Sequence, residues 1–179
     1  MRYYSQLGQD VIVDKLLKQK INGTFVDVGA SFYDDMNNSY FFELHRAWRG
    51  LAVEIDSVYN DGWKKRPNSV YINEDALKVD YKAEFEKMNM PSAIDYLSVD
   101  LEPPDVTYQA FCKIMETGYT FNVITFEVDY YRDISTRDPA RKMVEEMGYI
   151  LVGEVLDRGF HIDDIYVHNS IYDPSIKIT

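Results

Sequence analysis

A short apolar run that ends in glycine is the first stretch whose residue types could do chemistry. Residues 24–31 read Thr-Phe-Val-Asp-Val-Gly-Ala-Ser, which predicts a buried strand followed by a sharp turn. Gly29 permits a positive φ and lets a ligand approach the backbone closely. Ligands of open α/β sheets lie beyond the carboxyl ends of the strands. The stretch therefore predicts either a ligand-binding turn or a turn with no role beyond the fold.

A carboxylate near the end of the next apolar run favours a binding turn. Residues 50–56 read Gly-Leu-Ala-Val-Glu-Ile-Asp, so Glu54 is expected at the tip of a neighbouring strand. An acid roughly 20 residues after a glycine turn can accept hydrogen bonds from both ribose hydroxyls of a nucleotide-like ligand. The spacing from Gly29 to Glu54 is somewhat longer than that. The alternative is that Glu54 is a solvated acid at a strand end.

Acidic residues lie at the ends of five predicted strands. Because the carboxyl ends of parallel strands meet at one edge of a sheet, we expect these side chains to gather there. Like charges that gather raise each other's pKa, unless protons or a cation compensate them. The acids concerned are Asp27, then Glu54 and Asp56, then Asp75, then Asp100 and Glu102, and last Glu127 and Asp129.

The rest of the chain supplies the elements that must position these acids. Strands are expected at 24–28, 50–56, 70–72, 94–100 and 123–126, with helices between them at 40–48, 59–65 and 106–116, and a mixed segment at 81–88. A helix at 10–18 precedes the first strand, and another at 138–147 precedes a hairpin of 149–152 and 164–167. This pattern predicts an α/β, Rossmann-like fold: a mainly parallel twisted sheet with a C-terminal antiparallel hairpin, in one domain over 1–179.

Composition limits the classes of partner. The 179 residues include 30 acidic and 19 basic ones, a formal net charge of −11, which disfavours nucleic acid and anionic membranes as partners. The single cysteine excludes an internal disulfide and a CxxC metal site. Residues 1–6 show no apolar signal segment, so a cytoplasmic protein is expected. Oligomeric state cannot be read from these features.

The residues after Gly29 bear on the ligand. A dinucleotide site needs further glycines and a helix N-terminus for the pyrophosphate, whereas this turn continues Ala-Ser-Phe-Tyr-Asp-Asp. Two acids would repel a pyrophosphate. S-adenosylmethionine carries a sulfonium, an ammonium and two ribose hydroxyls, all of which suit acidic acceptors. The sequence therefore favours S-adenosylmethionine, with NAD as a poorer alternative.

At this point the sequence resembles the FkbM-like S-adenosylmethionine-dependent methyltransferases over most of its length. The resemblance rests on several short motifs, of which the Asp-x-Glu element after the fourth strand is the most specific. They are Ser-Gln-Leu-Gly-Gln-Asp at 5–10, Phe-Val-Asp-Val-Gly-Ala at 25–30, Asn-Ser-Tyr at 38–40, Trp-Arg-Gly-Leu at 48–51, Ile-Asp-Tyr-Leu-Ser-Val-Asp-Leu-Glu at 94–102, and Asp-Ile-Tyr-Val-His at 164–168. Tyr33 and the pair Pro103-Pro104 depart from the family pattern, in which glycines are usual.

The resemblance implies a class I methyltransferase fold, with Glu54 on the ribose, Asp75 and Ala76 beside the adenine, and Asp100 near the transferred methyl group. The full set of residues expected to bind the cofactor is Gln9, Asp27, Gly29, Ala30, Ser31, Ser39, Glu54, Ile55, Asp75, Ala76 and Asp100. The implied activity is O-methylation of a small-molecule or glycan hydroxyl. The alternative is a binding module that kept the fold and lost turnover, because Tyr33 could crowd the amino-acid end of the cofactor.

Methyl transfer to a hydroxyl needs an aligned acceptor and usually a base. Asp100, Glu102 and Glu127 are the candidate catalytic residues. No residue is assigned as a metal ligand. An alternative left open is that these three acids and Asp129 bind a Mg²⁺ ion through hard oxygen ligands.

Overall fold

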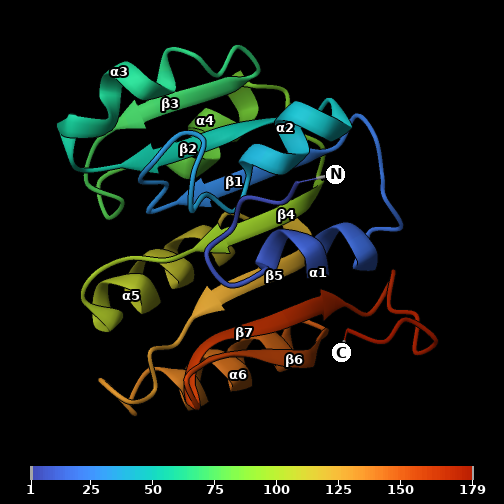
Figure 1. The fold of residues 1–179 in the computed structure, drawn as a ribbon. Helices are drawn as coiled ribbons and strands as arrows, with labels where there is room; N and C mark the ends of the chain where they lie inside the picture. The colour runs from blue at the N-terminus through green and yellow to red at the C-terminus, as the bar shows by residue number, and fades with distance from the viewer. Residues whose placement is uncertain (1, 179) are drawn as a thin grey trace.

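Within residues 2–178, which the computed structural model describes, seven strands form one twisted sheet (Figure 1). Their order is β3-β2-β1-β4-β5-β7-β6, with β1 to β5 parallel and β7 antiparallel to both of its neighbours. The strands are β1 (Thr24–Val28), β2 (Arg49–Glu54), β3 (Ser69–Asn73), β4 (Ala93–Val99), β5 (Thr120–Glu127), β6 (Tyr149–Asp157) and β7 (Phe160–His168). The predicted fold class, including the C-terminal antiparallel hairpin, is confirmed.

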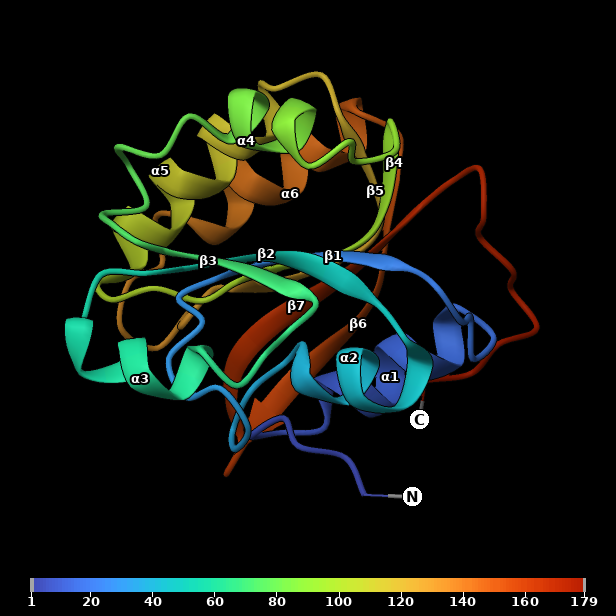
Figure 2. The same cartoon turned by 90° about the horizontal axis from the view of Figure 1, so that it is seen from above.

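Helices cover both faces of the sheet (Figure 2). They are α1 (Gln9–Leu16), α2 (Tyr40–Arg46), a 3-10 turn η1 (Ser57–Tyr59), α3 (Asn60–Trp63), α4 (Tyr81–Lys87), α5 (Pro104–Met115) and α6 (Arg137–Glu146). The first three α-helices lie on one face, and α4, α5 and α6 lie on the other. Among the described residues, no helix is long and apolar enough to cross a membrane.

Strand β1 is buried along its whole length because helices cover both of its faces. Phe25 packs in the cluster that includes α1 and α2 residues, whereas Val26 and Val28 pack in the cluster that includes α4, α5 and α6 residues. Strand β1 therefore carries apolar side chains on both faces of the sheet. Its carboxyl end is held between β2 and β4, where the predicted ligand edge lies.

Several element boundaries differ from the sequence-based expectation, and those of α5 and of the C-terminal hairpin bear on the site. Helix α5 begins at Pro104 and not at 106, because proline is tolerated in the first turn of a helix, where no backbone N–H donor is needed. The hairpin strands are longer than expected: β6 runs to Asp157 and β7 starts at Phe160, so Arg158 and Gly159 alone make the turn. As a result, the start of β7 reaches the same edge of the sheet as the end of β5.

A buried arginine fixes the long connection between β1 and α2. Arg66 is only 3% exposed, and its Nε donates to the Glu43 carboxylate (2.5 Å). Its Nη1 donates to the carbonyl of Tyr33 (2.8 Å), and its Nη2 donates to Ser39 Oγ (3.2 Å). One guanidinium thus joins the connection after β1 to helix α2. The turn that follows Gly29 is held in place from behind by this contact.

We expect Arg66→Ala to lower the free energy of unfolding by about 3–5 kcal/mol, because it leaves Glu43 as a buried and unpaired charge. Urea unfolding followed by circular dichroism measures the loss. Lys64→Ala is the control, since Lys64 pairs with Asp61 on the exposed side of α3 and exposed ion pairs contribute little. Equal effects of the two substitutions would contradict the role given to Arg66.

Candidate functional site

A cavity of about 400 Å³ lies beyond the carboxyl ends of β1, β2 and β4. This is the edge of the sheet at which the sequence places a ligand, and the volume is typical of a small-molecule site. Its lining carries five carboxyl groups and, among the described residues, no lysine or arginine. The lining residues are Gln6, Asp27, Gly29, Ala30, Ser31, Phe32, Met36, Asn37, Asn38, Glu54, Ile55, Asp56, Tyr59, Asp100, Leu101 and Glu102.

Gly29 closes the base of the cavity by letting two backbones meet. Its φ is +84°, and a Cβ built on it would lie 1.7 Å from the carbonyl oxygen of Asp100. Next to this contact, the amide of Asp100 donates to the carbonyl of Val28 (2.9 Å). The glycine is therefore required by the approach of the β4 end, in addition to lining the cavity. This contact brings Asp100 to the cavity.

Glu54 joins the two loops that form the cavity wall. Its Oε2 accepts from the amide of Ser31 (2.9 Å), and its Oε1 accepts from the amide of Asp56 (2.8 Å). The carboxylate is nearly buried, at 8% exposure. Each carboxylate oxygen can accept more than one hydrogen bond, so Glu54 can hold both loops and still accept from ligand hydroxyls.

Asp27 is a second buried acid of the lining. Asn37 Nδ2 donates to its Oδ2 (3.2 Å). Burial raises the pKa of Asp27 to about 6, although hydrogen bonds from Ser39 and Asn37 and the charge of Arg66 oppose that rise. A carboxyl with this pKa titrates close to neutral pH, and a nearby positive charge favours its ionised form.

The ends of β4, β5 and β7 bring three further carboxyl groups together. Burial, followed by the negative charge of Asp100, raises the pKa of Glu127 to about 11, so Glu127 holds a proton at neutral pH and donates a hydrogen bond to Asp100. Among the described residues, no hydrogen-bond partner reaches the buried Oε2 of Glu127. Burial also raises the pKa of Asp100, and the hydrogen bond from Glu127 opposes that rise.

Asp163, at the start of β7, is the third member of this group. Strand pairing sets it opposite Glu127. Burial and then the charge of Asp100 raise the pKa of Asp163 to about 7. The side chain of Gln9 donates from Nε2 to Asp163 Oδ2 (2.7 Å), which opposes the rise.

Two more acids of this edge, Glu102 and Asp129, share one arginine. Arg132 Nη1 donates to Asp129 Oδ2 (2.9 Å) and also to Glu102 Oε1. The three predicted catalytic residues thus fall into two groups. Asp100 and Glu127 contact each other, whereas Glu102 pairs with Arg132 at the rim of the cavity. Asp100 and Glu102 line the cavity, and Glu127 lies behind Asp100.

Seven of the eleven predicted cofactor-binding residues line the cavity, and four lie elsewhere. The seven are Asp27, Gly29, Ala30, Ser31, Glu54, Ile55 and Asp100. Ser39 is fully buried and donates to Asn37 Oδ1 (3.0 Å), and Gln9 holds Asp163. Asp75 accepts from the amide of Leu77 (2.9 Å), and Ala76 packs in the hydrophobic core. These four contacts support the fold around the cavity.

Gln6 is a lining residue that the sequence did not suggest. The N-terminal segment is held by Asp10, which accepts from the amides of Tyr4 (2.6 Å) and Ser5 (3.1 Å) and from the Ser5 hydroxyl (2.5 Å). Gln6 follows directly and reaches the cavity. The Ser-Gln-Leu-Gly-Gln-Asp motif therefore contains the signal: Ser5 and Asp10 form the clasp, and Gln6 faces the ligand space.

Tyr33, which could have crowded the amino-acid end of a bound cofactor, lies outside the lining. Its hydroxyl accepts from Lys65 Nζ (3.0 Å), and that ammonium lies 4.7 Å from the ring centroid. The ring also lies against Gly62, where a Cβ would come within 2.5 Å of it. Tyr33 therefore packs against α3 and the chain after it, and the neighbouring residues Ser31 and Phe32 face the cavity instead.

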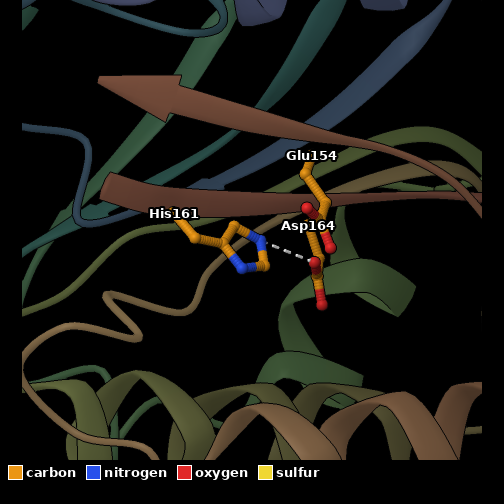
Figure 3. A group of neighbouring side chains, drawn as sticks. All are labelled: Glu154, His161 and Asp164. Atoms are coloured by element: carbon orange, nitrogen blue, oxygen red, sulfur yellow. Dashed lines mark ion pairs between the residues drawn. The ribbon is translucent and has the colours of Figure 1, made fainter. Parts of the chain in front are cut away.

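A second group of ionisable side chains lies on the C-terminal hairpin (Figure 3). The side chains of Glu154, His161 and Asp164 converge, and His161 Nε2 lies 2.9 Å from Asp164 Oδ1. Arg141 Nη2 already donates to Glu154 Oε1 and to Asp164 Oδ1, each at 2.6 Å. The guanidinium compensates both carboxylates, so the group ties helix α6 to the hairpin.

The raised pKa values predict that stability falls as pH rises. Between about pH 4 and its folded pKa, each such acid is protonated when folded and ionised when unfolded, so the folded state binds more protons. The free energy of unfolding then falls by up to about 1.4 kcal/mol per pH unit for each group. Asp163→Asn removes one of these groups and keeps an acceptor for Gln9.

Urea unfolding of the Asp163→Asn protein between about pH 5 and 7 should therefore show a shallower decline than the wild type. Asp61→Asn is the control, because the pairing of Asp61 with Lys64 lowers its pKa and places its titration below this range. Identical slopes for Asp163→Asn and the wild type would show that Asp163 is not held protonated by its surroundings.

Solved structures of other proteins share the fold of this chain. No protein-family profile and no curated protein matches the chain. Solved structures do match over nearly the whole chain. An rRNA methylase from Streptococcus thermophilus superposes with a TM-score of 0.56 at 11% identity, over 88% of this chain and 94% of that one.

Two further matches were solved with the cofactor or its product. Human methyltransferase-like protein 13 in complex with SAH gives a TM-score of 0.56 at 16% identity, over 97% of this chain and 83% of that one. M. jannaschii TYW2 in complex with AdoMet gives 0.53 at 14% identity, over 93% and 78%. These likenesses, together with the strand order, show that the chain has the class I S-adenosylmethionine-dependent methyltransferase fold.

Proposed function

We propose that this chain is an S-adenosylmethionine-dependent methyltransferase that binds its cofactor in the cavity at the carboxyl ends of β1, β2 and β4. The observation that carries the proposal is the charge of the lining: five carboxyl groups and no basic side chain among the described residues. S-adenosylmethionine brings two positive groups and two ribose hydroxyls, and its own carboxylate is the one negative group. Such a ligand relieves the repulsion that an empty acidic cavity must tolerate.

Glu54, Gly29 and Asp100 have distinct roles in this proposal. Glu54 accepts from the ribose hydroxyls while it holds the loops that begin at Ser31 and Asp56. Gly29 lets the β1 and β4 ends close together and so brings Asp100 beside the ligand. The acidic lining disfavours NAD, because the pyrophosphate would meet carboxylates and no cation.

Asp100 is the proposed general base for a hydroxyl acceptor. Burial raises its pKa, which makes its carboxylate a better proton acceptor than a solvated aspartate. Glu127 holds it by a hydrogen bond from behind. The motifs shared with FkbM-like methyltransferases favour a small-molecule or glycan hydroxyl as the acceptor. One structural neighbour is an rRNA methylase, but the acidic cavity disfavours a nucleic-acid acceptor here.

The placement of Tyr33 supports an active enzyme over a binding module without turnover. That alternative was motivated by Tyr33, which could fill the space of the methionine moiety, and by the short chain, which has little room for a substrate-binding insertion. Tyr33 instead contacts Lys65 and Gly62, which leaves Ser31 and Phe32 at the cavity. Tyr33 therefore does not fill the cavity beside Ser31 and Phe32.

Calorimetric titration tests the cofactor assignment. We expect S-adenosylmethionine and its demethylated product to bind with micromolar dissociation constants, and NAD not to bind. Glu54→Ala should weaken binding by about 1.5–3 kcal/mol, roughly 10- to 150-fold, because hydrogen bonds to a charged acceptor are lost. Circular dichroism of the variant separates this loss from unfolding.

Asp61→Asn serves as the control for the titration, since it removes a carboxylate that lies outside the lining of the cavity. Its affinity for the cofactor should equal that of the wild type. Binding of NAD without binding of S-adenosylmethionine would overturn the proposal.

A further inference from the structure

Arg132 lies where the sequence pattern would place a metal ion. Asp100, Glu102, Glu127 and Asp129 were the oxygen ligands of the alternative left open by the sequence, in which they bind a Mg²⁺ ion. The structure divides them into two pairs. Asp100 and Glu127 contact each other, and Glu102 and Asp129 are bridged by the guanidinium of Arg132.

The bridge spans two loops that follow neighbouring strands. Glu102 belongs to the loop between β4 and α5 and lines the cofactor cavity. Asp129 belongs to the loop between β5 and α6, and its side chain is only 5% exposed. A carboxylate buried to this degree needs a positive partner or a proton. Arg132, whose side chain is 38% exposed, supplies that partner from the same loop and reaches across to Glu102.

A divalent cation does not fit the set while Arg132 is in place. Mg²⁺ demands close, near-octahedral oxygen coordination at about 2.0–2.1 Å. The Arg132 nitrogen already lies at hydrogen-bond distance from one oxygen of each carboxylate of its pair. Its positive charge would also repel an incoming cation. A guanidinium likewise stands in place of an ion in the cluster of Glu154, His161 and Asp164 on the hairpin, because Arg141 bridges Glu154 and Asp164 beside His161.

We propose that Arg132 is a positioning residue that takes the electrostatic place of a metal ion, so that the site works without a divalent cation. It holds Glu102 at the cavity rim and joins the loop after β5 to the loop after β4. The part of the proposal that concerns methyl transfer rests on the proposed function. The part that concerns the binding of cations does not depend on the proposed function.

Thermal unfolding with and without Mg²⁺ tests the inference. Wild-type protein in about 5 mM MgCl₂ should melt at the same temperature as in NaCl of equal ionic strength. Arg132→Ala should melt lower in NaCl by roughly 2–4 °C and should recover part of that loss in MgCl₂, because Glu102 and Asp129 are then free to bind the ion. Arg132→Lys keeps the charge and should not gain from Mg²⁺.

Two variants act as controls. Lys142→Ala, at an exposed position of α6, changes the net charge as Arg132→Ala does and should show no gain from Mg²⁺. Adding Asp129→Asn to Arg132→Ala should abolish the gain. The inference is overturned if Mg²⁺ stabilises the wild type as much as Arg132→Ala, or if Arg132→Ala gains no more than Lys142→Ala. Either result can occur whether or not the protein binds S-adenosylmethionine, so calorimetric titration of the cofactor tests the proposed function separately.

Discussion

The carboxyl edge of the sheet buries several carboxyl groups, and each of them needs a compensating group. A bare carboxylate removed from water is too costly to persist in a folded protein. Two solutions are found at this edge: Arg132 compensates Glu102 and Asp129, and a proton on Glu127 serves Asp100. A third is found away from the edge, where Arg66 compensates Glu43 of α2 behind the turn after Gly29. Arg132 joins the loops after β4 and β5, and Glu54 joins the loops after β1 and β2.

This arrangement leaves one part of the edge poorly compensated. The acids that face the cavity, Asp27, Glu54, Asp56, Asp100 and Glu102, have no basic residue among the described lining. The pKa values of Asp27 and Asp100 are raised because burial disfavours their charge. Such a site is less stable when empty than when a cationic ligand fills it. The edge of the sheet is therefore least stable around the empty cavity, where a bound ligand can supply the missing positive charge.

The sequence predicted the fold and the position of the cavity because both depend on local patterns. Short apolar runs that end in acids gave the strands and their shared edge, and Gly29 and Glu54 line the cavity as expected. Asp75 and Ala76 were expected beside the adenine from the family resemblance, and their contacts lie in the loop after β3 and in the core.

The contacts that compensate the acids could not be read from the sequence, because they join residues far apart in the chain. Arg66 stands in a Lys-Lys-Arg run that looks like a solvated helix end, yet it is buried against Glu43. Asp163 was missed because the last strand was expected to begin at residue 164, whereas it begins at Phe160. Extending the hairpin pairing toward its turn sets Asp163 opposite Glu127, which is the signal that could have found it.

The most direct measurement of the central claim is methyl transfer from methyl-labelled S-adenosylmethionine to components of a host-cell extract, with wild-type and Asp100→Asn protein compared side by side. We expect the wild type to transfer label to an extract component. We expect Asp100→Asn to transfer none, at cofactor concentrations at which that variant still binds the cofactor. Binding of the cofactor by the wild type without any transfer of label would contradict the account and indicate a binding module.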